Sequence, residues 1–511
     1  MTLNTSVYII SLMQLIKSFI YMTKTNPSVI LGIFVSIVFL ILLAIRLDVF
    51  TKDNEKGALS QKTEIQRPAE SWMNIYQKDK KIGVIHRQFI ITETGKMHSQ
   101  ENVTMQISTL GTTQVLHLKM ETDLNPDMSF SSFSFELNSS LFSFLAHGYA
   151  THDRLILFSG QPSSQQRSEI PLKDIPYVSG NIYEAAFSTG LEKNASRDFT
   201  IFDPSTTGIR KINVTRQADE VIPIMGKRVL TQKFCADFMG AKNCAWLSKE
   251  GEVLKETGLL GLSMEKVSPQ KATEDMAVVA NVDFAQIASV ESNVKINEPE
   301  RLNEIKIKID GIRNTPLFLN GGRQAFAQRI LTITKENFTE TVTQKNAIQE
   351  NMRRYLDPTP LVQSDHEQIK AQAQKIVRPS DNPLQITEKI VQWVYANIKK
   401  TPVLSVPNAL EVLNNKMGDC NEHAVLTAAL LRAAGVPAQI EAGLVYQNGR
   451  FYYHAWNLAY AGNWITVDSV FNQIPADVTH IRLTRGEGGV QLDLLGVMGK
   501  ISLEVLSTKY D

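Results

Sequence analysis

The sequence predicts an α+β protein with an N-terminal transmembrane helix, a long antiparallel β-rich domain and a compact core of helices and strands. Three observations carry this prediction. Residues 28–45 form an unbroken apolar run, residues 67–290 repeat alternating strand patterns, and residues 351–482 change from helical spacing to a strand hairpin. The predicted segments are a membrane anchor at 1–50, a linker at 51–66, the β-rich domain at 67–290, a small strand-rich insert at 291–350, the core at 351–482 and a C-terminal tail docked on the core at 483–511.

The length and composition of the chain limit the functions that it can have. The chain has 511 residues, of which 43% are hydrophobic and 21% charged, so it is long enough for two or three domains and too apolar to be disordered. Its net charge is only +1, and it has no basic patch interleaved with aromatic residues and no Gly-rich phosphate loop. We therefore expect no nucleic-acid partner and no cofactor.

The apolar run at 28–45, "SVILGIFVSIVFLILLAI", contains neither a charge nor a proline. Eighteen such residues are about enough for a helix to cross a bilayer. The segment that follows, "RLDVFTKDNEKG", offers no small-residue cleavage site. The run is therefore predicted to be a retained anchor and not a removed signal peptide.

The β-rich domain is predicted from segments such as "KKIGVIHRQFII", "VLHLKMETDL" and "FSSFSFEL", which alternate apolar and polar residues. The segment "NCAWLSKEGEVLKE" has the form of a hairpin, and the insert contributes "EIKIKIDGI" and "RILTITKENFTETVTQ". No residue indicates whether this domain binds a substrate, binds a partner or only holds the core away from the membrane.

The core contains a helix whose ends are clearly marked, in "KMGDCNEHAVLTAALLRAAGVP" at 416–437. Asp419 and Glu422 can form a capping box, and Gly435 can supply the left-handed stop. Cys420 then occupies the first helical turn, where unpaired N–H groups and the helix dipole should favour the reactive thiolate. The alternative is that Cys420 is a small buried apolar residue.

A nucleophilic cysteine needs a base, and a third group that orients the base. A predicted hairpin supplies both, because its first strand, at about 450–460, carries His454 and its second, starting near residue 464, carries Asp468.

The register of this hairpin decides whether the two side chains meet. A three-residue loop at 461–463, with Asn463 in the left-handed conformation, places His454 and Asp468 on one face. A two-residue Gly-Asn turn is equally acceptable and places them on opposite faces. We prefer the first register for its chemistry.

The motifs "GDCNEHA", "LLRAAGVPA", "YHAWN" and "NWITVDS", in this order, resemble the core of the transglutaminase-like superfamily, whose members are related to papain-type cysteine proteases. The resemblance covers about residues 361–472. It implies a central helix that bears the cysteine and packs on an antiparallel sheet. It also implies that Cys420 is the nucleophile, His454 the base and general acid, and Asp468 the orienting carboxylate.

The implied reaction is acyl transfer on protein or peptide amide bonds through a thioester on Cys420. Hydrolysis by a membrane-anchored peptidase or amidase is the expected outcome, because water is the default acceptor. A protein-crosslinking transglutaminase is the first alternative, and a non-catalytic binding scaffold with the same fold is the second.

Other residues near the motifs are weaker candidates. Trp393 or Tyr395 is nominated as the second oxyanion donor, beside the Cys420 backbone N–H, although helical core packing explains both. Trp456 and Trp464 are nominated as walls of the groove, although sheet core explains them nearly as well.

No metal site is predicted. His423 shares the side of the helix that carries Cys420, but no second Cys/His pair stands at zinc spacing, so His423 is interpreted as packing or as support for the site. No acidic loop suggests calcium.

The sequence contains conflicting signals about the side of the membrane on which the core lies. Two lysines precede the apolar run, but basic residues at 46, 52, 56 and 62 follow it, which favours a cytoplasmic core. A single N-terminal anchor is, however, the usual way to export a long domain, as in the exported bacterial proteins that this layout resembles. Cys235 and Cys244 are close enough in sequence for a disulfide, or they are two free thiols. We expect an inner-membrane protein with a periplasmic catalytic part.

Overall fold

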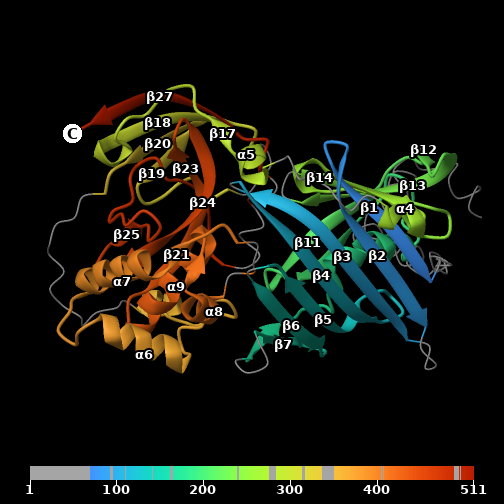
Figure 1. The fold of residues 1–511 in the computed structure, drawn as a ribbon, viewed down its shortest axis with the longest axis horizontal. Helices are drawn as coiled ribbons and strands as arrows, with labels where there is room; N and C mark the ends of the chain where they lie inside the picture. Colours follow the sequence, from blue (N-terminus) through green and yellow to red (C-terminus); the bar gives the residue numbers. More distant parts are fainter. Residues whose placement is uncertain are drawn as a thin grey trace, which may run out of the picture. The chain divides into compact units, whose positions relative to one another are not determined.

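The structure is a computed structural model, and it describes most of the chain after residue 68 (Figure 1). The described residues are 69–91, 96–109, 111–140, 142–160, 165–238, 241–274, 283–312, 317–336, 350–403, 406, 408–487, 494 and 497–511. The predicted anchor at 28–45 and the linker at 51–66 lie outside them. Within the described ranges, no helix combines the length and apolar character needed to span a bilayer.

The N-terminal half of the described chain forms one large antiparallel sheet, as predicted, drawn in blue to green in Figure 1. The first strand of this sheet pairs with its last strand, β16. Among the described strand pairs of this sheet, only that of β9 with β10 is parallel. The strands are β1 (Glu70–Gln77), β2 (Lys80–Ile91), β3 (Met97–Thr109), β4 (Thr112–Leu124), β5 (Phe130–Asn138), β6 (Ser143–Ala150), β7 (Arg154–Ser159), β8 (Gln166–Pro171), β9 (Tyr177–Val178), β10 (Ser196–Asp203), β11 (Gly208–Arg216), β12 (Glu220–Ile224), β13 (Lys227–Phe238), β14 (Ala241–Leu247), β15 (Val253–Thr257) and β16 (Leu262–Val267).

One face of this sheet is buried because alternate side chains point to the same side. Phe130, Phe133 and Phe202 meet there with ring centroids 5.0–6.0 Å apart. Helix α3 (Ile182–Ser188) packs on strands β10 and β13 with its apolar residues buried. Shorter helices are α4 (Pro269–Thr273), α5 (Phe284–Ala288) and the 3-10 turns Ser179–Asn181, Leu259–Gly261, Pro299–Arg301 and Glu350–Tyr355.

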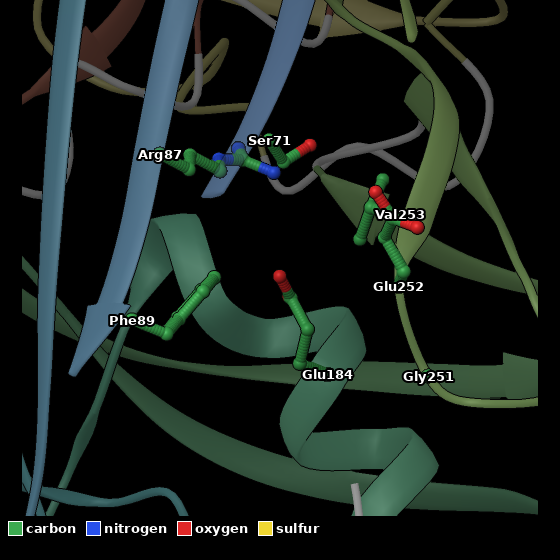
Figure 2. Close-up of a pocket in the computed structure, with 7 residues that line it drawn as sticks. All are labelled: Ser71, Arg87, Phe89, Glu184, Gly251, Glu252 and Val253. Carbon is green, nitrogen blue, oxygen red and sulfur yellow. The ribbon is translucent and has the colours of Figure 1, made fainter. Parts of the chain in front are cut away.

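The same region contains a small cavity beside a buried ion pair, shown in Figure 2. Its empty volume is about 250 Å³, part of it open to solvent, and Arg87 and Glu184 are among the side chains that line it. Arg87 donates to Glu256 at 3.1 Å and to Glu101, so carboxylates on β15 and β3 compensate the buried guanidinium.

Cys235 and Cys244 lie directly opposite each other on β13 and β14. Their Cα atoms are 4.0 Å apart and their sulfurs are bonded. Of the two possibilities left open by the sequence, the structure therefore has the disulfide.

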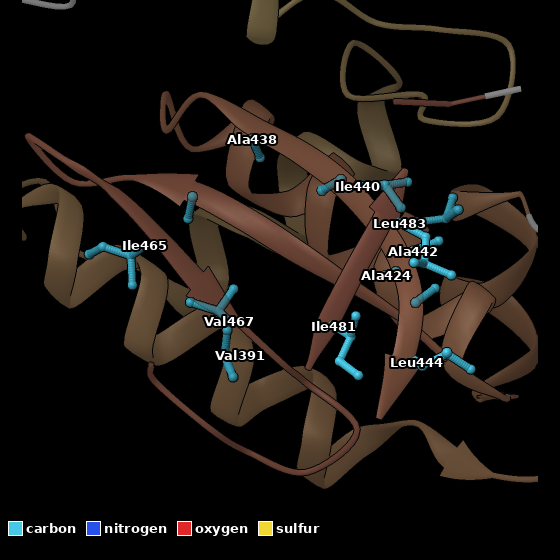
Figure 3. Close-up of a cluster of buried hydrophobic side chains, with 14 of the residues drawn as sticks. Val391, Ala424, Ala438, Ile440, Ala442, Leu444, Ile465, Val467, Ile481 and Leu483 are labelled. Atoms are coloured by element: carbon cyan, nitrogen blue, oxygen red, sulfur yellow. The ribbon is translucent and has the colours of Figure 1, made fainter. Parts of the chain in front are cut away.

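The C-terminal part of the described chain is built around helix α9 (Cys420–Ala433), which is apolar nearly all round. It packs on β23 (Ala438–Gln447) and β24 (Arg450–Tyr460), and helices α6 (Glu367–Ile376), α7 (Pro383–Asn397) and α8 (Ala409–Asn415) pack against it. The sheet order is β17 (Val290–Glu291), β24, β23 and β26 (Ile481–Arg485), with β25 (Trp464–Val467) also paired to β24. Figure 3 shows the buried aliphatic side chains of β23 and β26 beside Ala424 of α9.

A third sheet joins distant parts of the chain. Strands β18 (Leu302–Asp310), β19 (Gln324–Ala327) and β20 (Ile330–Thr334) come from the predicted insert, and β27 (Ser502–Tyr510) of the tail pairs with β18. Leu503 and Val505 belong to the same buried cluster as the residues of α9. The remaining strands, β21 (Lys399–Lys400) and β22 (Met417–Gly418), form a short parallel pair. The predicted domain boundaries are not tested by these pairings and stay predictions.

Leu426 gives a test of the central packing of α9, because its side chain is 0% exposed. We expect Leu426→Ala to lower the free energy of unfolding by about 2–5 kcal/mol, since it leaves a cavity that its neighbours fill only in part. Leu506→Ala is the matched control, because Leu506 is 45% exposed. Urea denaturation followed by tryptophan fluorescence measures both, and equal losses in the two variants would contradict the packing described here.

Candidate active site

Cys420 is the first residue of α9, and the local sequence determines where this helix begins. The Asp419 side chain accepts a hydrogen bond from the Asn421 N–H at 3.0 Å, and Glu422 accepts one from the Asp419 N–H at 2.9 Å. This is the predicted capping box. A Cβ added at Gly418 would lie only 2.2 Å from the Cβ of Glu422, so the chain needs glycine there. The cap therefore places Cys420, partly exposed, on the first helical turn.

The hairpin of β24 and β25 has the register that brings the predicted base and acid to one face. Tyr460 pairs with Trp464, which leaves the three-residue loop 461–463 between the strands. The preferred register is thus confirmed, but the left-handed residue is Gly462, with φ 94°, and not Asn463. Glycine takes this conformation because it has no Cβ to clash with the backbone.

His454 and Asp468 form the central contact of the site. Nε2 of His454 donates to Oδ2 of Asp468 at 2.7 Å, and the two residues are 8% and 0% exposed. The other carboxylate oxygen, Oδ1, accepts the backbone N–H groups of Val470 at 2.6 Å and Phe471 at 3.2 Å. Because Nε2 is occupied by Asp468, Nδ1 is the nitrogen of His454 that remains for proton transfer.

The cysteine helix lies against this hairpin. Asn457 of β24 donates to the Ala424 carbonyl of α9 at 2.9 Å. The Cys420 thiol forms a hydrogen bond with the backbone of Ala455, the residue that follows His454. The structure therefore brings the helix start, the predicted base and the predicted acid into one region.

The predicted preference for a thiolate is wrong for this geometry. Burial raises the pKa of the Cys420 thiol well above its usual value, and the charge of Asp419 raises it further. The hydrogen bond from the Ala455 backbone lowers it, but not enough to compensate. Removal of water from the sulfur is thus the largest cause of the raised pKa.

Asp419 itself is affected by the same environment. Burial raises the pKa of its carboxyl group well above the usual value, and the neighbouring Glu422 raises it further. The charge of Asp419 therefore acts on the thiol more strongly as the pH rises and the carboxyl group ionises.

A second histidine, His480, contacts the same carboxylate and was not identified from the sequence. Its Nε2 donates to Oδ2 of Asp468 at 2.9 Å, and its Nδ1 lies 3.3 Å from Oδ1 of Asp477. Burial alone would lower the pKa of His480, but the charge of Asp477 and hydrogen bonds to Asp468 and Asp477 raise it to about 9. For Asp468, burial acts to raise the pKa, but the charge and hydrogen bond of His454 and the hydrogen bond of His480 bring it well below its usual range.

Buried charges beneath the histidines connect the site to the insert. Glu441 accepts the Trp456 indole N–H at 2.9 Å and pairs with Arg482 at 3.3 Å and Arg485 at 2.6 Å. Arg482 in turn donates to carbonyl oxygens of the segment before β19, at residues 318, 320 and 321. These contacts fix the strand that follows His480.

The two tryptophans nominated as walls of the groove, Trp456 and Trp464, lie in different environments. Trp456 is 1% exposed and packs beside His454 and His480, so it presents no surface to a substrate. Trp464 is partly buried and contacts Tyr355 edge-on at 5.2 Å.

The two nominated oxyanion donors each contact a lysine. The Lys416 ammonium lies over the Trp393 ring at 4.5 Å, and Lys400 lies over the Tyr395 ring at 3.8 Å. No described contact joins either ring to Cys420, so the oxyanion role stays a prediction.

His423 is fully buried, and its Nδ1 contacts the Asp419 carbonyl at 2.6 Å. Burial lowers its pKa. These facts agree with the interpretation of His423 as a residue that packs at the helix start.

His454, Asp468 and His480 carry ligand types that metals use, and their donor atoms lie within 4.8 Å of one another. Their arrangement does not fit a metal site, however. Both imidazoles already point an N–H at one oxygen of Asp468, and the other oxygen accepts two backbone N–H groups. The cluster is explained as a hydrogen-bonded network, and the absence of a metal stays a prediction.

Comparison with known proteins agrees with the motifs. The family model of the transglutaminase-like superfamily matches residues 370–469, which include Cys420, His454 and Asp468. No curated protein matches the chain.

Three solved structures illustrate the similarity at low identity. A candidate cysteine protease from Cytophaga hutchinsonii is 17% identical, with 44% of this chain and 86% of that chain covered and a TM-score of 0.26. A β-barrel-like protein of unknown function from Brucella abortus is 12% identical, with 39% of this chain and 95% of that chain covered and a TM-score of 0.30. The periplasmic domain of TgpA from Pseudomonas aeruginosa is 16% identical, with 37% of this chain and 91% of that chain covered and a TM-score of 0.23.

Asp419→Asn tests the cause assigned to the raised thiol pKa. Asparagine caps a helix as well as aspartate but carries no charge, so the pKa of Cys420 should fall. We expect iodoacetamide to alkylate the variant roughly two- to tenfold faster than the wild type at pH 8–9, with a gain that shrinks as the pH is lowered and Asp419 takes up its proton. Mass spectrometry gives the rates. An unchanged or slower rate in a folded variant would contradict the assignment.

Proposed function

Because residues 370–469 are a transglutaminase-like domain, we propose that this chain is a thiol acyl-transfer enzyme that acts on protein or peptide amide bonds. The observation that carries the proposal is the 2.7 Å hydrogen bond between His454 and Asp468, on a hairpin that packs against the helix beginning at Cys420. A base oriented by a carboxylate next to a cysteine is the arrangement that nucleophilic catalysis requires.

The first step forms an acyl-enzyme. Nδ1 of His454 takes the proton of the Cys420 thiol while the sulfur attacks the amide carbonyl carbon. This transfer is necessary because burial raises the pKa of the thiol, so little thiolate exists beforehand. Asp468 stabilises the imidazolium and holds its ring in place.

The tetrahedral oxyanion needs preorganised donors. We assign the Cys420 backbone N–H, which is free at the first helical turn, as one donor, and Trp393 or Tyr395 remains the candidate for the second. His454 then gives its proton to the leaving amine, the C–N bond breaks, and a thioester on Cys420 remains.

The acceptor decides the product. With water, His454 takes a proton from the attacking molecule, and the products are a carboxylic acid and free Cys420. With a lysine amine, a new amide forms. We favour hydrolysis, because water is always available and no residue described here marks a site for a second protein.

We further propose that the enzyme is anchored in the inner membrane and that its catalytic part lies in the periplasm. Two features support this placement: the apolar run at 28–45, and the Cys235–Cys244 disulfide, a bond typical of oxidising compartments.

Labelling of Cys420 by iodoacetamide tests whether His454 acts as the base for the Cys420 thiol. We expect His454→Ala to slow labelling at pH 7.5 by about a hundredfold, which is the lower range of the effect of a general base. The thermal unfolding curve of each variant is the control. If a folded His454→Ala variant labels as fast as the wild type, Cys420 does not depend on His454, and the scaffold alternative is favoured.

The product test uses casein and a fluorescent primary amine, with Cys420→Ala as the blank. We expect the wild type to release peptides or ammonia from casein without attaching the amine, and the blank to do neither. Attachment of the amine that depends on Cys420 would show that crosslinking is the activity and that the hydrolytic proposal is wrong.

A further inference from the structure

Asp468 is shared by two imidazoles, which the catalytic scheme above does not require. Oδ2 accepts Nε2–H of His454 at 2.7 Å and Nε2–H of His480 at 2.9 Å. The two ring centroids are 5.8 Å apart, and His480 is 0% exposed. A single oxygen therefore links the proposed base to a second, fully buried histidine.

The contacts of His480 indicate its charge. While Nε2 faces Asp468, Nδ1 faces the carbonyl oxygen of Asp477 at 3.2 Å and its carboxylate Oδ1 at 3.3 Å. Neither nitrogen faces a donor, so a neutral ring would turn one lone pair toward oxygen. These contacts therefore favour a hydrogen on both nitrogens, which makes the ring a cation.

The partner carboxylate is held in its ionised form. Oδ1 of Asp477 accepts the Thr479 N–H at 2.8 Å and the Thr479 hydroxyl at 2.6 Å. Oδ2 accepts the Gln473 side-chain amide at 2.9 Å. Burial acts to raise the pKa of Asp477, but the charge of His480 and these hydrogen bonds lower it.

We propose that His480 is a positioning residue that acts through Asp468, as a buried cation that fixes Oδ2 and shares its negative charge with His454. The inference rests on the proposed function, because it assigns His480 a role in how His454 holds its proton. With part of the Asp468 charge compensated by His480, imidazolium at His454 is stabilised less than it would be by a lone aspartate. His454 can then release its proton to the leaving amine more readily.

Other charged groups lie around this pair. The guanidinium of Arg323 reaches the His480 carbonyl at 3.5 Å and lies 3.9 Å from Glu336. Below the ring, Trp456 separates His480 from Glu441, which is compensated by two arginines. The carboxyl groups of Asp419, Glu422 and Asp468 all act electrostatically on the Cys420 thiol. Besides His454, His480 is the group among these that contacts the Asp468 carboxylate directly.

His480→Gln separates charge from hydrogen bonding. The amide keeps a donor for Oδ2 of Asp468 but carries no charge, so the proton on His454 should be bound more tightly. For a ring separation of 5.8 Å and an effective dielectric constant between about 20 and 40, the rising limb of the pH profile of Cys420 alkylation should move up by roughly one to two pH units.

The matched control is His423→Gln. His423 is also fully buried and lies one helical turn from Cys420, but burial lowers its pKa, so its replacement removes no positive charge. Its profile should stay within about 0.3 units of the wild type. If a folded His480→Gln variant gives a profile superimposable on the wild type, His480 is only a hydrogen-bond donor and the inference is overturned.

A measurement on the wild type covers the case in which His480→Gln does not fold. Nitrogen-15 chemical shifts of the His480 ring should show both nitrogens protonated between pH 6 and pH 8. A neutral ring at pH 7 overturns the inference. A reactive Cys420 with a neutral His480 refutes this inference alone, whereas an unreactive Cys420 beside a cationic His480 refutes the proposed function.

Discussion

The hydrogen bond between His454 and Asp468 is the interaction on which the site depends, and the hairpin register is what makes it possible. With one residue fewer in the loop, every side chain of β25 would change face and Asp468 would point away from the base. Gly462 adopts the left-handed conformation that closes the three-residue loop. Two backbone N–H groups on Oδ1 then hold the carboxylate, so its position does not rely on the histidine alone.

Burial gives this site its chemical character. The thiol, the carboxyl of Asp419 and the imidazole of His423 are all shifted toward their neutral forms, whereas Asp468 and His480 stay charged because each is hydrogen-bonded to an opposite charge. A thiol that is shifted toward its neutral form needs its base at the moment of attack. This is why the account relies on proton transfer to His454 and not on a preformed thiolate.

Local signals predicted much of this arrangement. The cap at Asp419 and the strand bounds of β24 follow from neighbouring residues, and the structure agrees with both. The support around Asp468 could not be predicted in the same way. His480 and Arg482 act through residues that are distant along the chain, at 468 and 318–321, and a lone histidine at the start of a strand has no spacing that identifies it. The thiol pKa was misjudged because burial of the sulfur depends on tertiary packing, whereas the helix dipole can be inferred from the sequence.

The most direct test of the central claim is intact-mass spectrometry after mixing the protein with p-nitrophenyl acetate and quenching in acid. The account predicts an acetyl thioester on Cys420 in the wild type, and much less of it in Asp468→Asn, where the orienting charge is lost but the side-chain volume is kept. An adduct at another residue, or equal acetylation of Cys420 in both proteins, would contradict the claim that sulfur, imidazole and carboxylate act together.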